Sequence, residues 1–186
     1  TLRPIDRVQL DGVRGGEDWT ASFHLGYTIG NPPVFHPYTH DNMNALLEWV
    51  YEQYPMINRN RTVVTGNSMG GSGGRIWVMR QPEKFAAWFP TIHQWRYSYV
   101  VGSWQCATWE TGDVRSGAKY GSAPVLGKGT TYGEWADGIA YLSNPANRAP
   151  WIGWTVGRQD TTQPWRDHLD ALAALQATRR GFAFAW

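Results

Sequence analysis

The chain has 186 residues, which is enough for one folded domain. Its composition, with 42% hydrophobic and 17% charged residues, is that of a globular protein and not of a disordered one. A net charge of +2 with scattered arginines argues against a nucleic-acid partner. The single cysteine, Cys106, excludes an internal disulfide framework and is expected to be structural; no cysteine–histidine spacing indicates a metal site. No apolar run approaches the roughly 20 residues that span a bilayer, so no membrane partner is expected.

The elements of the first half alternate between strand and helix. Residues 20–27 are predicted as a strand and residues 30–37, which are rich in glycine and proline, as a loop. Apolar residues at helical spacing predict a helix that begins near Thr39 or Asp41 and ends before Pro55. A buried strand over 61–65, a glycine-rich turn over 66–74, a helix over 75–80 and a strand over 85–92 follow.

The second half begins with an irregular segment. Residues 94–149 are aromatic, rich in glycine and poorly periodic, with an element expected only at 133–142, so we interpret them as a lid or substrate-binding insertion. Four of the chain's tryptophans in or beside it follow no periodic pattern and either fill a core or line a groove for flat ligands: Trp95, Trp104, Trp109 and Trp135.

The chain then returns to regular structure. A strand over 150–156, a turn, a helix over 165–178 with Leu169, Leu172 and Leu175 on its buried side, and a last strand over 182–186 are predicted. This alternation predicts a single α/β domain over 1–186, a mostly parallel sheet with helices on both faces and an irregular, tryptophan-rich insertion.

Residues 66–70 (GNSMG) fit the pattern G-x-S-x-G, which holds a nucleophilic serine on a sharp turn between a strand and a helix in α/β-hydrolases. A second match at residues 70–74 overlaps it. Ser68 directly follows the predicted strand, whereas Ser72 lies a full turn farther on, so we identify Ser68 as the nucleophile. The backbone N–H of Met69 is then one donor of the oxyanion hole.

A nucleophilic serine needs a histidine base and a carboxylate that orients it, in the chain order Ser, Asp or Glu, His. Asp160 follows a predicted strand and is the expected acid. His168 follows Asp160 but falls in the middle of a helix, where we expect it at the surface, and His93 is expected only to line the site. We expect the fold to be incomplete at both ends, the catalytic histidine to lie beyond Trp186, and these residues alone to lack a working base.

Residues 58–71 (NRNRTVVTGNSMGG) resemble a segment of secreted esterases related to polyhydroxybutyrate depolymerases and feruloyl or acetylxylan esterases. Residues 80–87 and 150–160 are similar to later passages of the same group. The resemblance implies an α/β-hydrolase fold, hydrolysis of carboxylic esters through an acyl-enzyme, no metal or organic cofactor, and an extracellular or periplasmic location. It carries over Ser68 as nucleophile, the Met69 amide as oxyanion donor and Asp160 as acid.

The substrate is expected to be a small-molecule or polymer-linked ester, including aromatic esters. Asn67, Trp95 and Trp104 are the residues expected to shape its pocket. Two other functions stay open: a serine peptidase resembling prolyl oligopeptidase, and a non-catalytic, hydrolase-like module that binds carbohydrate. The oligomeric state is left open.

Overall fold

The computed structural model describes residues 27–29, 34–96, 124–160 and 164–186. The chain divides into two compact units, one formed by Thr1–Asp41 with Tyr97–Asp137 and the other by Asn42–Arg96 with Gly138–Trp186. Among the described residues, no helix has the length and apolar character needed to cross a membrane.

The first unit contains a short hairpin and one short helix. Strand β1 (Tyr27–Ile29) pairs antiparallel with β2 (Val34–His36). Helix α5 (Tyr132–Ala136) begins with a capping box between Thr131 and Glu134. The ring of Phe35 in β2 packs against those of Tyr132 and Trp135, with centroids 4.6 and 5.4 Å away, and forms the small core of this unit.

Strand β2 corrects one prediction, because residues 34–36 lie in the segment expected to be loop. The apolar run Val34-Phe35 favours a strand, and Phe35 also exchanges backbone hydrogen bonds with Pro124 and Leu126, a long-range pairing that the flanking prolines conceal in the sequence. The strand predicted over 20–27 falls almost entirely outside the described residues.

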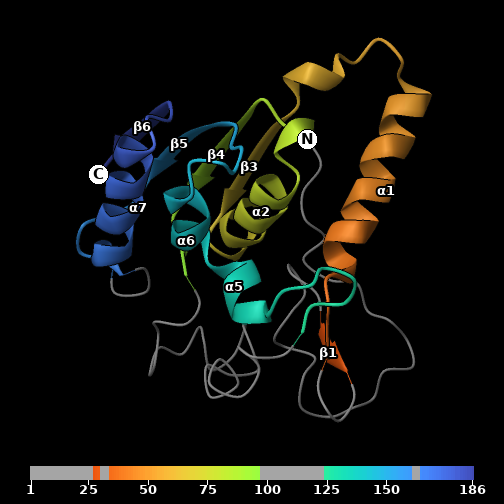
Figure 1. The fold of residues 1–186 in the computed structure, drawn as a ribbon. Helices are drawn as coiled ribbons and strands as arrows, with labels where there is room; N and C mark the ends of the chain where they lie inside the picture. The colour runs from red at the N-terminus through yellow and green to blue at the C-terminus, as the bar shows by residue number, and fades with distance from the viewer. Residues whose placement is uncertain (1–26, 30–33, 97–123, 161–163) are drawn as a thin grey trace. The chain divides into compact units, whose positions relative to one another are not determined.

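The second unit is built on a four-stranded parallel sheet, as the alternation predicts (Figure 1). Its strands are β3 (Val63–Asn67), β4 (Ala87–Thr91), β5 (Trp151–Thr155) and β6 (Phe182–Ala185), and they are adjacent in that order. The register pairs Asn67 with Thr91 and Thr91 with Thr155, so the carboxyl ends of three strands meet at one edge.

Four helices accompany this sheet: α1 (Tyr38–Gln53), α2 (Met69–Arg80), α6 (Gly138–Ser143) and α7 (Trp165–Ala177). The predicted helix over 75–80 begins six residues earlier than expected, because the glycine-rich segment is itself helical. These glycines let α2 lie close to the sheet: a Cβ on Gly74 would lie 3.1 Å from Cγ1 of Val64. Two 3-10 turns, η1 (Arg59–Arg61) and η2 (Pro82–Lys84), complete the connections.

The main core lies between these helices and one face of the sheet (Figure 1). Val64, Trp88 and Ile152 point into it from neighbouring strands. The residues one step along these strands, Val63, Phe89 and Trp151, face the other way and stay exposed, so the described helices cover one face of the sheet rather than the two that were expected.

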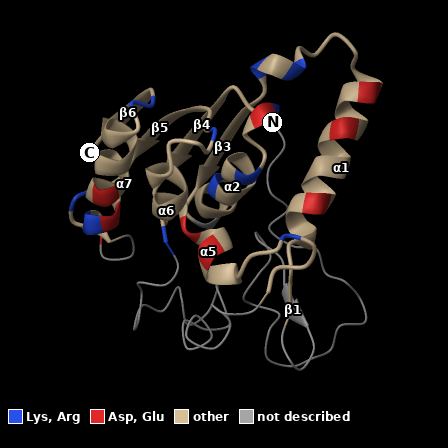
Figure 2. Cartoon of the chain, viewed as in Figure 1, with Lys and Arg blue, Asp and Glu red and all other residues tan. Residues whose placement is uncertain are grey.

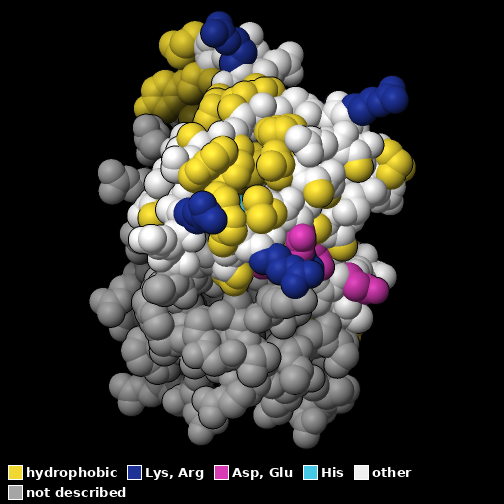
Figure 3. All heavy atoms as spheres, turned by 90° about the vertical axis from the view of Figure 1, so that its left-hand side faces the viewer, with side chains coloured by type: hydrophobic (Ala, Val, Ile, Leu, Met, Phe, Trp, Pro, Cys, Tyr) yellow, Lys and Arg dark blue, Asp and Glu magenta, His cyan; other side chains and the backbone are white. Residues whose placement is uncertain are grey.

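The core also corrects the buried side predicted for α7. Leu175 is fully buried, but Leu169 is exposed and Leu172 only partly buried. The helix instead turns His168 and Ala171 inward. Figure 3 shows the side of the molecule that carries α7 and β6, where hydrophobic side chains gather at the surface.

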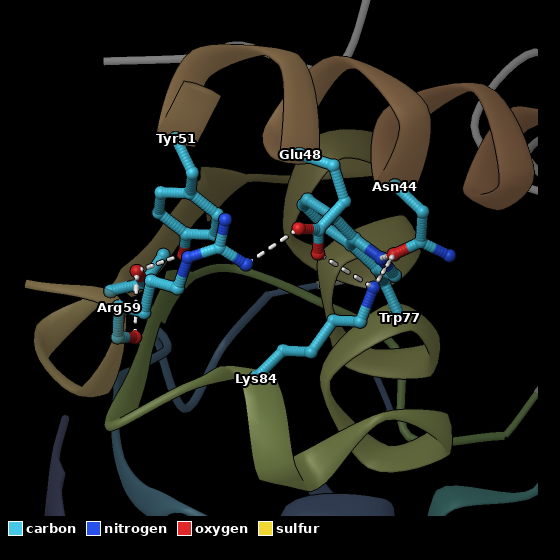
Figure 4. Close-up of polar contacts among 7 residues, drawn as sticks. Asn44, Glu48, Tyr51, Arg59, Trp77 and Lys84 are labelled. Atoms are coloured by element: carbon cyan, nitrogen blue, oxygen red, sulfur yellow. Dashed lines mark hydrogen bonds and ion pairs between the residues drawn. The ribbon is translucent and has the colours of Figure 1, made fainter. Parts of the chain in front are cut away.

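Polar side chains fasten α1 to the connections around β3 and α2 (Figure 4). Glu48 accepts from Arg59 at 2.7 Å and from Lys84 at 3.4 Å. The indole of Trp77 donates to the Asn44 side chain at 2.8 Å. Figure 2 shows that acidic residues recur along α1, and the following turn η1 consists of two arginines around an asparagine, so opposite charges meet at this contact. The exposed ion pairs orient α1 and add little to stability.

Candidate active site

Ser68 lies on the turn between β3 and α2, at the carboxyl edge of the sheet. Its backbone has φ 51° and ψ −118°, a conformation that residues with a side chain rarely adopt and that costs on the order of 1–3 kcal/mol. The Ser68 amide donates to the carbonyl of Thr91 at 2.9 Å, so the neighbouring strand β4 holds the turn. The side chain is partly exposed at this bend. This is the strained geometry that a nucleophile elbow requires.

Gly66 makes the bend possible. A Cβ on this residue would lie 2.5 Å from the carbonyl oxygen of Gly70, closer than any real contact, and the obstacle is backbone that cannot rotate away. Only glycine lets the first turn of α2 fold back over the end of β3. Steric exclusion of a Cβ therefore explains why the sequence motif begins with glycine.

The amino end of α2 lies beside Ser68. Met69 is the first residue of this helix, and the first N–H groups of a helix have no partner within it and carry partial positive charge. Asn67, the last residue of β3, is exposed at the same edge. The backbone thus places Met69 where the oxyanion donor is expected.

Ser72, the serine of the overlapping motif, lies inside α2 and is 3% exposed. Its Oγ accepts a hydrogen bond from the Gln94 amide at 3.0 Å. A buried hydroxyl with this structural contact cannot meet a substrate, which agrees with the choice of Ser68 made from the sequence.

Asp160 follows β5, two strands away from β3, the strand that ends before Ser68. Its amide donates to the Gly157 carbonyl at 3.0 Å, which closes a turn directly after the strand. Because parallel strands lie about 4.8 Å apart, the ends of β3 and β5 are separated by about 10 Å at the same edge. Ser68 and Asp160 are therefore brought to one edge of the sheet, as the sequence predicts.

Residues 92–96, which we call the connector, lie between these two positions and follow β4. Ile92 has φ 50°, an outlier for a β-branched residue, and its amide donates to the Thr155 carbonyl of β5 at 2.9 Å. The connector is also fixed to α2, because a guanidinium N–H of the buried Arg75 donates to the Trp95 carbonyl. At its end, Arg96 forms ion pairs with Asp167 and Asp170 of α7.

Trp95 does not line an open pocket, contrary to the role expected for it. Its side chain is fully buried, with its ring centroid 5.6 Å from that of Trp88 and 5.4 Å from that of Trp154. The indole Nε1–H donates to Nδ1 of His168 at 3.0 Å. Trp95 thus belongs to the core that supports the edge. Trp104, the other tryptophan expected at the pocket, lies outside the described residues.

His168 was expected at the surface, and that prediction is wrong: the side chain is completely buried. Burial lowers the pKa of His168 to about 4, although the negative charge of Asp160 acts in the opposite direction. A signal was present in the sequence, because His168, Ala171 and Leu175 follow one another at helical spacing and form the inward stripe of α7.

His93 in the connector is buried as well. A Cβ on Gly71 of α2 would lie 3.1 Å from its Cβ, so His93 packs against the first turn of α2, next to Ser68. The pKa of His93 lies well below its usual range, mainly because the ring is buried and to a smaller extent because His168 and Arg75 lie nearby. Neither His93 nor His168 is hydrogen-bonded to Ser68 in the part of the chain that the structure describes, so neither is identified there as the expected base.

No group of three or more histidine, cysteine or acidic residues that could hold a metal ion is found among the described residues. The groups at this edge are the hydroxyl of Ser68 on a strained turn, the N–H groups at the start of α2 beside it, and the carboxylate of Asp160 on the loop after β5.

Comparison with known proteins relates the chain to esterases. The family model Esterase, described as "Putative esterase", matches residues 5–184. No curated protein matches the sequence.

Solved structures share the fold at low sequence identity. The fluorophosphonate-binding serine hydrolase FphF of Staphylococcus aureus is 20% identical with a TM-score of 0.56, over 82% of this chain and 56% of that one. The S-formylglutathione hydrolase FrmB of Staphylococcus aureus is 19% identical with a TM-score of 0.55, over 78% of this chain and 54% of that one. An acylaminoacyl peptidase of Pyrococcus horikoshii is 17% identical with a TM-score of 0.56, over 79% and 22%. The chain thus matches little more than half of the two hydrolases and about a fifth of the peptidase.

Proposed function

The chain belongs to the Esterase family, and we propose that it hydrolyses carboxylic esters through an acyl-enzyme on Ser68. The backbone of Ser68 carries this proposal. Ser68, on a turn between a parallel strand and a helix, has φ 51°, a strained conformation typical of a nucleophile elbow, and the residue is partly exposed.

In the proposed reaction the Ser68 oxygen attacks the ester carbonyl while a histidine accepts its proton, and the carbonyl oxygen becomes an oxyanion. The Met69 N–H at the start of α2 stabilises that oxyanion. The alcohol leaves with the proton held by the histidine, and water then releases the acid from Ser68. Asp160 orients the histidine, for which we propose a residue outside the described part of the chain.

The proposed substrates are polymer-linked or aromatic esters, as the resemblance to depolymerases and feruloyl esterases implies, and the proposed location is extracellular or periplasmic. Asn67, exposed beside Ser68, is proposed to contact the substrate. Trp95 is excluded from this role because its indole is enclosed in the core.

Labelling with a fluorophosphonate probe tests the proposal. We expect the protein that carries its catalytic histidine to be labelled once per chain and the label to disappear in Ser68→Ala. Ser72→Ala is the matched control, since it removes the other serine of the overlapping motifs, and it should still be labelled on Ser68. Labelling that survives Ser68→Ala would reject Ser68 as nucleophile.

A parallel assay separates the esterase from the peptidase alternative. We expect turnover of p-nitrophenyl acetate and none of an acylated alanyl p-nitroanilide, because only the ester is proposed as substrate. Equal turnover of the anilide would favour a peptidase, and carbohydrate binding without turnover of either would favour a binding module.

A further inference from the structure

Three aromatic rings, which we call the edge aromatic cluster, lie together where α7 begins and β6 ends. Trp165 is the first residue of α7, Phe184 lies in β6, and Trp186 follows that strand. The ring centroid of Phe184 lies 5.7 Å from that of Trp165 and 5.4 Å from that of Trp186, and the centroids of the two indoles are 6.2 Å apart. Each of the three rings therefore contacts the other two.

This cluster is fixed on one side and open to solvent on the other. The ring of Phe184 stacks on that of Trp154 in the main core, with centroids 4.6 Å apart and an interplanar angle of 20°. Trp165 and Phe184 are partly buried against this core, whereas Trp186 is 75% exposed. Hydrophobic side chains gather at the surface on the side of the molecule that carries α7 and β6 (Figure 3). An apolar patch kept exposed on a packed support is typical of a binding surface.

The cluster lies at the same edge of the sheet as the proposed nucleophile. Ala185 in β6 pairs with Thr155 in β5, and its carbonyl accepts from the Val156 amide at 3.3 Å, so the carboxyl ends of these two strands lie side by side. Neighbouring parallel strands are about 4.8 Å apart, so three strand spacings, or about 14 Å, separate the end of β3 from the end of β6. The rings are therefore too far from Ser68 to meet the reacting carbonyl, but a long substrate reaches both.

The chemistry of the three rings favours a neutral aromatic ligand. The rings carry no charge and are inclined to one another, at 34° between Trp165 and Phe184 and at 68° between the two indoles, so they do not form a flat platform on which a sugar ring could stack. Inclined rings offer both faces and edges to a further aromatic ring, which prefers an edge-to-face or offset arrangement. On the proposed esterase function, we infer that the edge aromatic cluster is a distal binding site for an aromatic group of a long ester substrate, away from its scissile bond.

Esters that carry a phenyl ring at the end of a long chain test the inference, on the protein that carries its catalytic histidine. One pair of substrates varies the acyl side, p-nitrophenyl ω-phenyldecanoate against p-nitrophenyl decanoate, and a second pair varies the alcohol side, ω-phenyldecyl acetate against decyl acetate. All are used below the concentration at which they form micelles. We expect the terminal ring to raise kcat/KM by about 10-fold in at least one of the two pairs, because its contact with the cluster contributes to binding along the whole reaction.

Trp186→Ala should remove most of this gain and change kcat/KM for p-nitrophenyl acetate by less than about twofold, because the acetate ester does not reach the cluster. Trp186→Phe keeps a ring at this position and should keep most of the gain. Trp151→Ala is the matched control, since this tryptophan is 40% exposed but lies at the amino end of β5, at the opposite edge of the sheet. Its effect on kcat/KM should be the same factor for the esters with and without the terminal ring.

The midpoint of urea unfolding should be the same in Trp186→Ala as in the unsubstituted protein, because the ring is mostly exposed. A lower midpoint would mean that another part of the protein covers the ring, and it would overturn the inference. The same holds for no gain in either pair, for an equal loss with every ester in Trp186→Ala, or for a larger gain from a terminal glucosyl group than from the phenyl ring. In these cases turnover of p-nitrophenyl acetate leaves the proposed esterase in place, whereas no turnover of any ester rejects the proposed function and the inference with it.

Discussion

Of the three described residues with side chains that have a positive φ, Ser68 and Ile92 lie at the carboxyl edge of the sheet, whereas Arg179 follows α7. Ser68 and Ile92 are linked through Thr91, whose carbonyl accepts from Ser68 and which directly precedes Ile92. The strain, on the order of 1–3 kcal/mol for each residue, is held in place by hydrogen bonds from the ends of neighbouring strands. At the scale of single residues, the shape of the turns at the sheet edge therefore lowers the stability of the fold.

Gly66→Ala tests how tightly the nucleophile turn is built. We expect it to lower the free energy of unfolding by at least about 1–3 kcal/mol and to abolish fluorophosphonate labelling, because the new methyl group would meet the Gly70 carbonyl at 2.5 Å. The measurement is urea denaturation combined with the labelling rate.

Gly157→Ala is its control at the same edge. A Cβ there would meet only the Asp160 amide, at 4.0 Å, and the backbone is not left-handed, so stability should change by less than about 0.5 kcal/mol. If Gly66→Ala were as harmless as this control, the tight-turn interpretation would be wrong.

At the scale of elements, α7 illustrates how one helix serves both the core and the site. Its inward stripe carries His168, Ala171 and Leu175, so the residue that bonds the connector through Trp95 and the residue that fills the core belong to the same face. Packing of this face fixes the rotation of the helix and therefore the direction of the imidazole.

A pair of leucine substitutions checks that rotation. Leu175→Ala should destabilise the protein by about 2–5 kcal/mol, because the side chain is fully buried, whereas Leu169→Ala, 44% exposed, should cost less than about 0.5 kcal/mol. Thermal or urea unfolding measures both. Comparable losses in the two variants would place α7 in another rotation about its axis.

The sequence predicts the sheet of the second unit well, since short apolar runs alternate with helical periods. It misses the start of α2 at Met69, because glycine has a low helix propensity and only the close approach to Val64 explains its use there. It also places Ser68 and Asp160 at one edge from their order after the strands. The inward position of His168 could have been predicted from its helical spacing, but its hydrogen bond to Trp95 could not, because a bond across 73 residues leaves no local pattern.

At the scale of the whole molecule, the core of the second unit encloses two histidines, His93 and His168, among tryptophan rings. The ring centroids of His93 and His168 lie 5.3 Å apart, and both have their pKa lowered mainly by burial. The folded protein therefore keeps these rings neutral at a pH at which the unfolded chain would protonate them.

This arrangement predicts acid sensitivity between about pH 6.5 and pH 4. In that window the unfolded chain binds more protons than the folded one, so the free energy of unfolding falls as the pH falls, by as much as about 3 kcal/mol for His168 alone. Arg75 beside His93 adds to the effect and Asp160 beside His168 reduces it.

Urea denaturation at several pH values measures this slope. His168→Gln and His93→Gln should each flatten the decline between pH 6.5 and pH 5, a range above most carboxylate titration. If the free energy of unfolding declined as steeply in both variants as in the unsubstituted protein, the acid sensitivity would belong to other groups.

The connector described above has a consequence for engineering. Its residues Gln94, Trp95 and Arg96 are each secured to a helix of the second unit before the chain moves on to position 97. Sequence grafted after that point would begin from a stem that is already anchored, so chimaeras that exchange the following segment between relatives should leave the packing of β4 against α2 and α7 undisturbed.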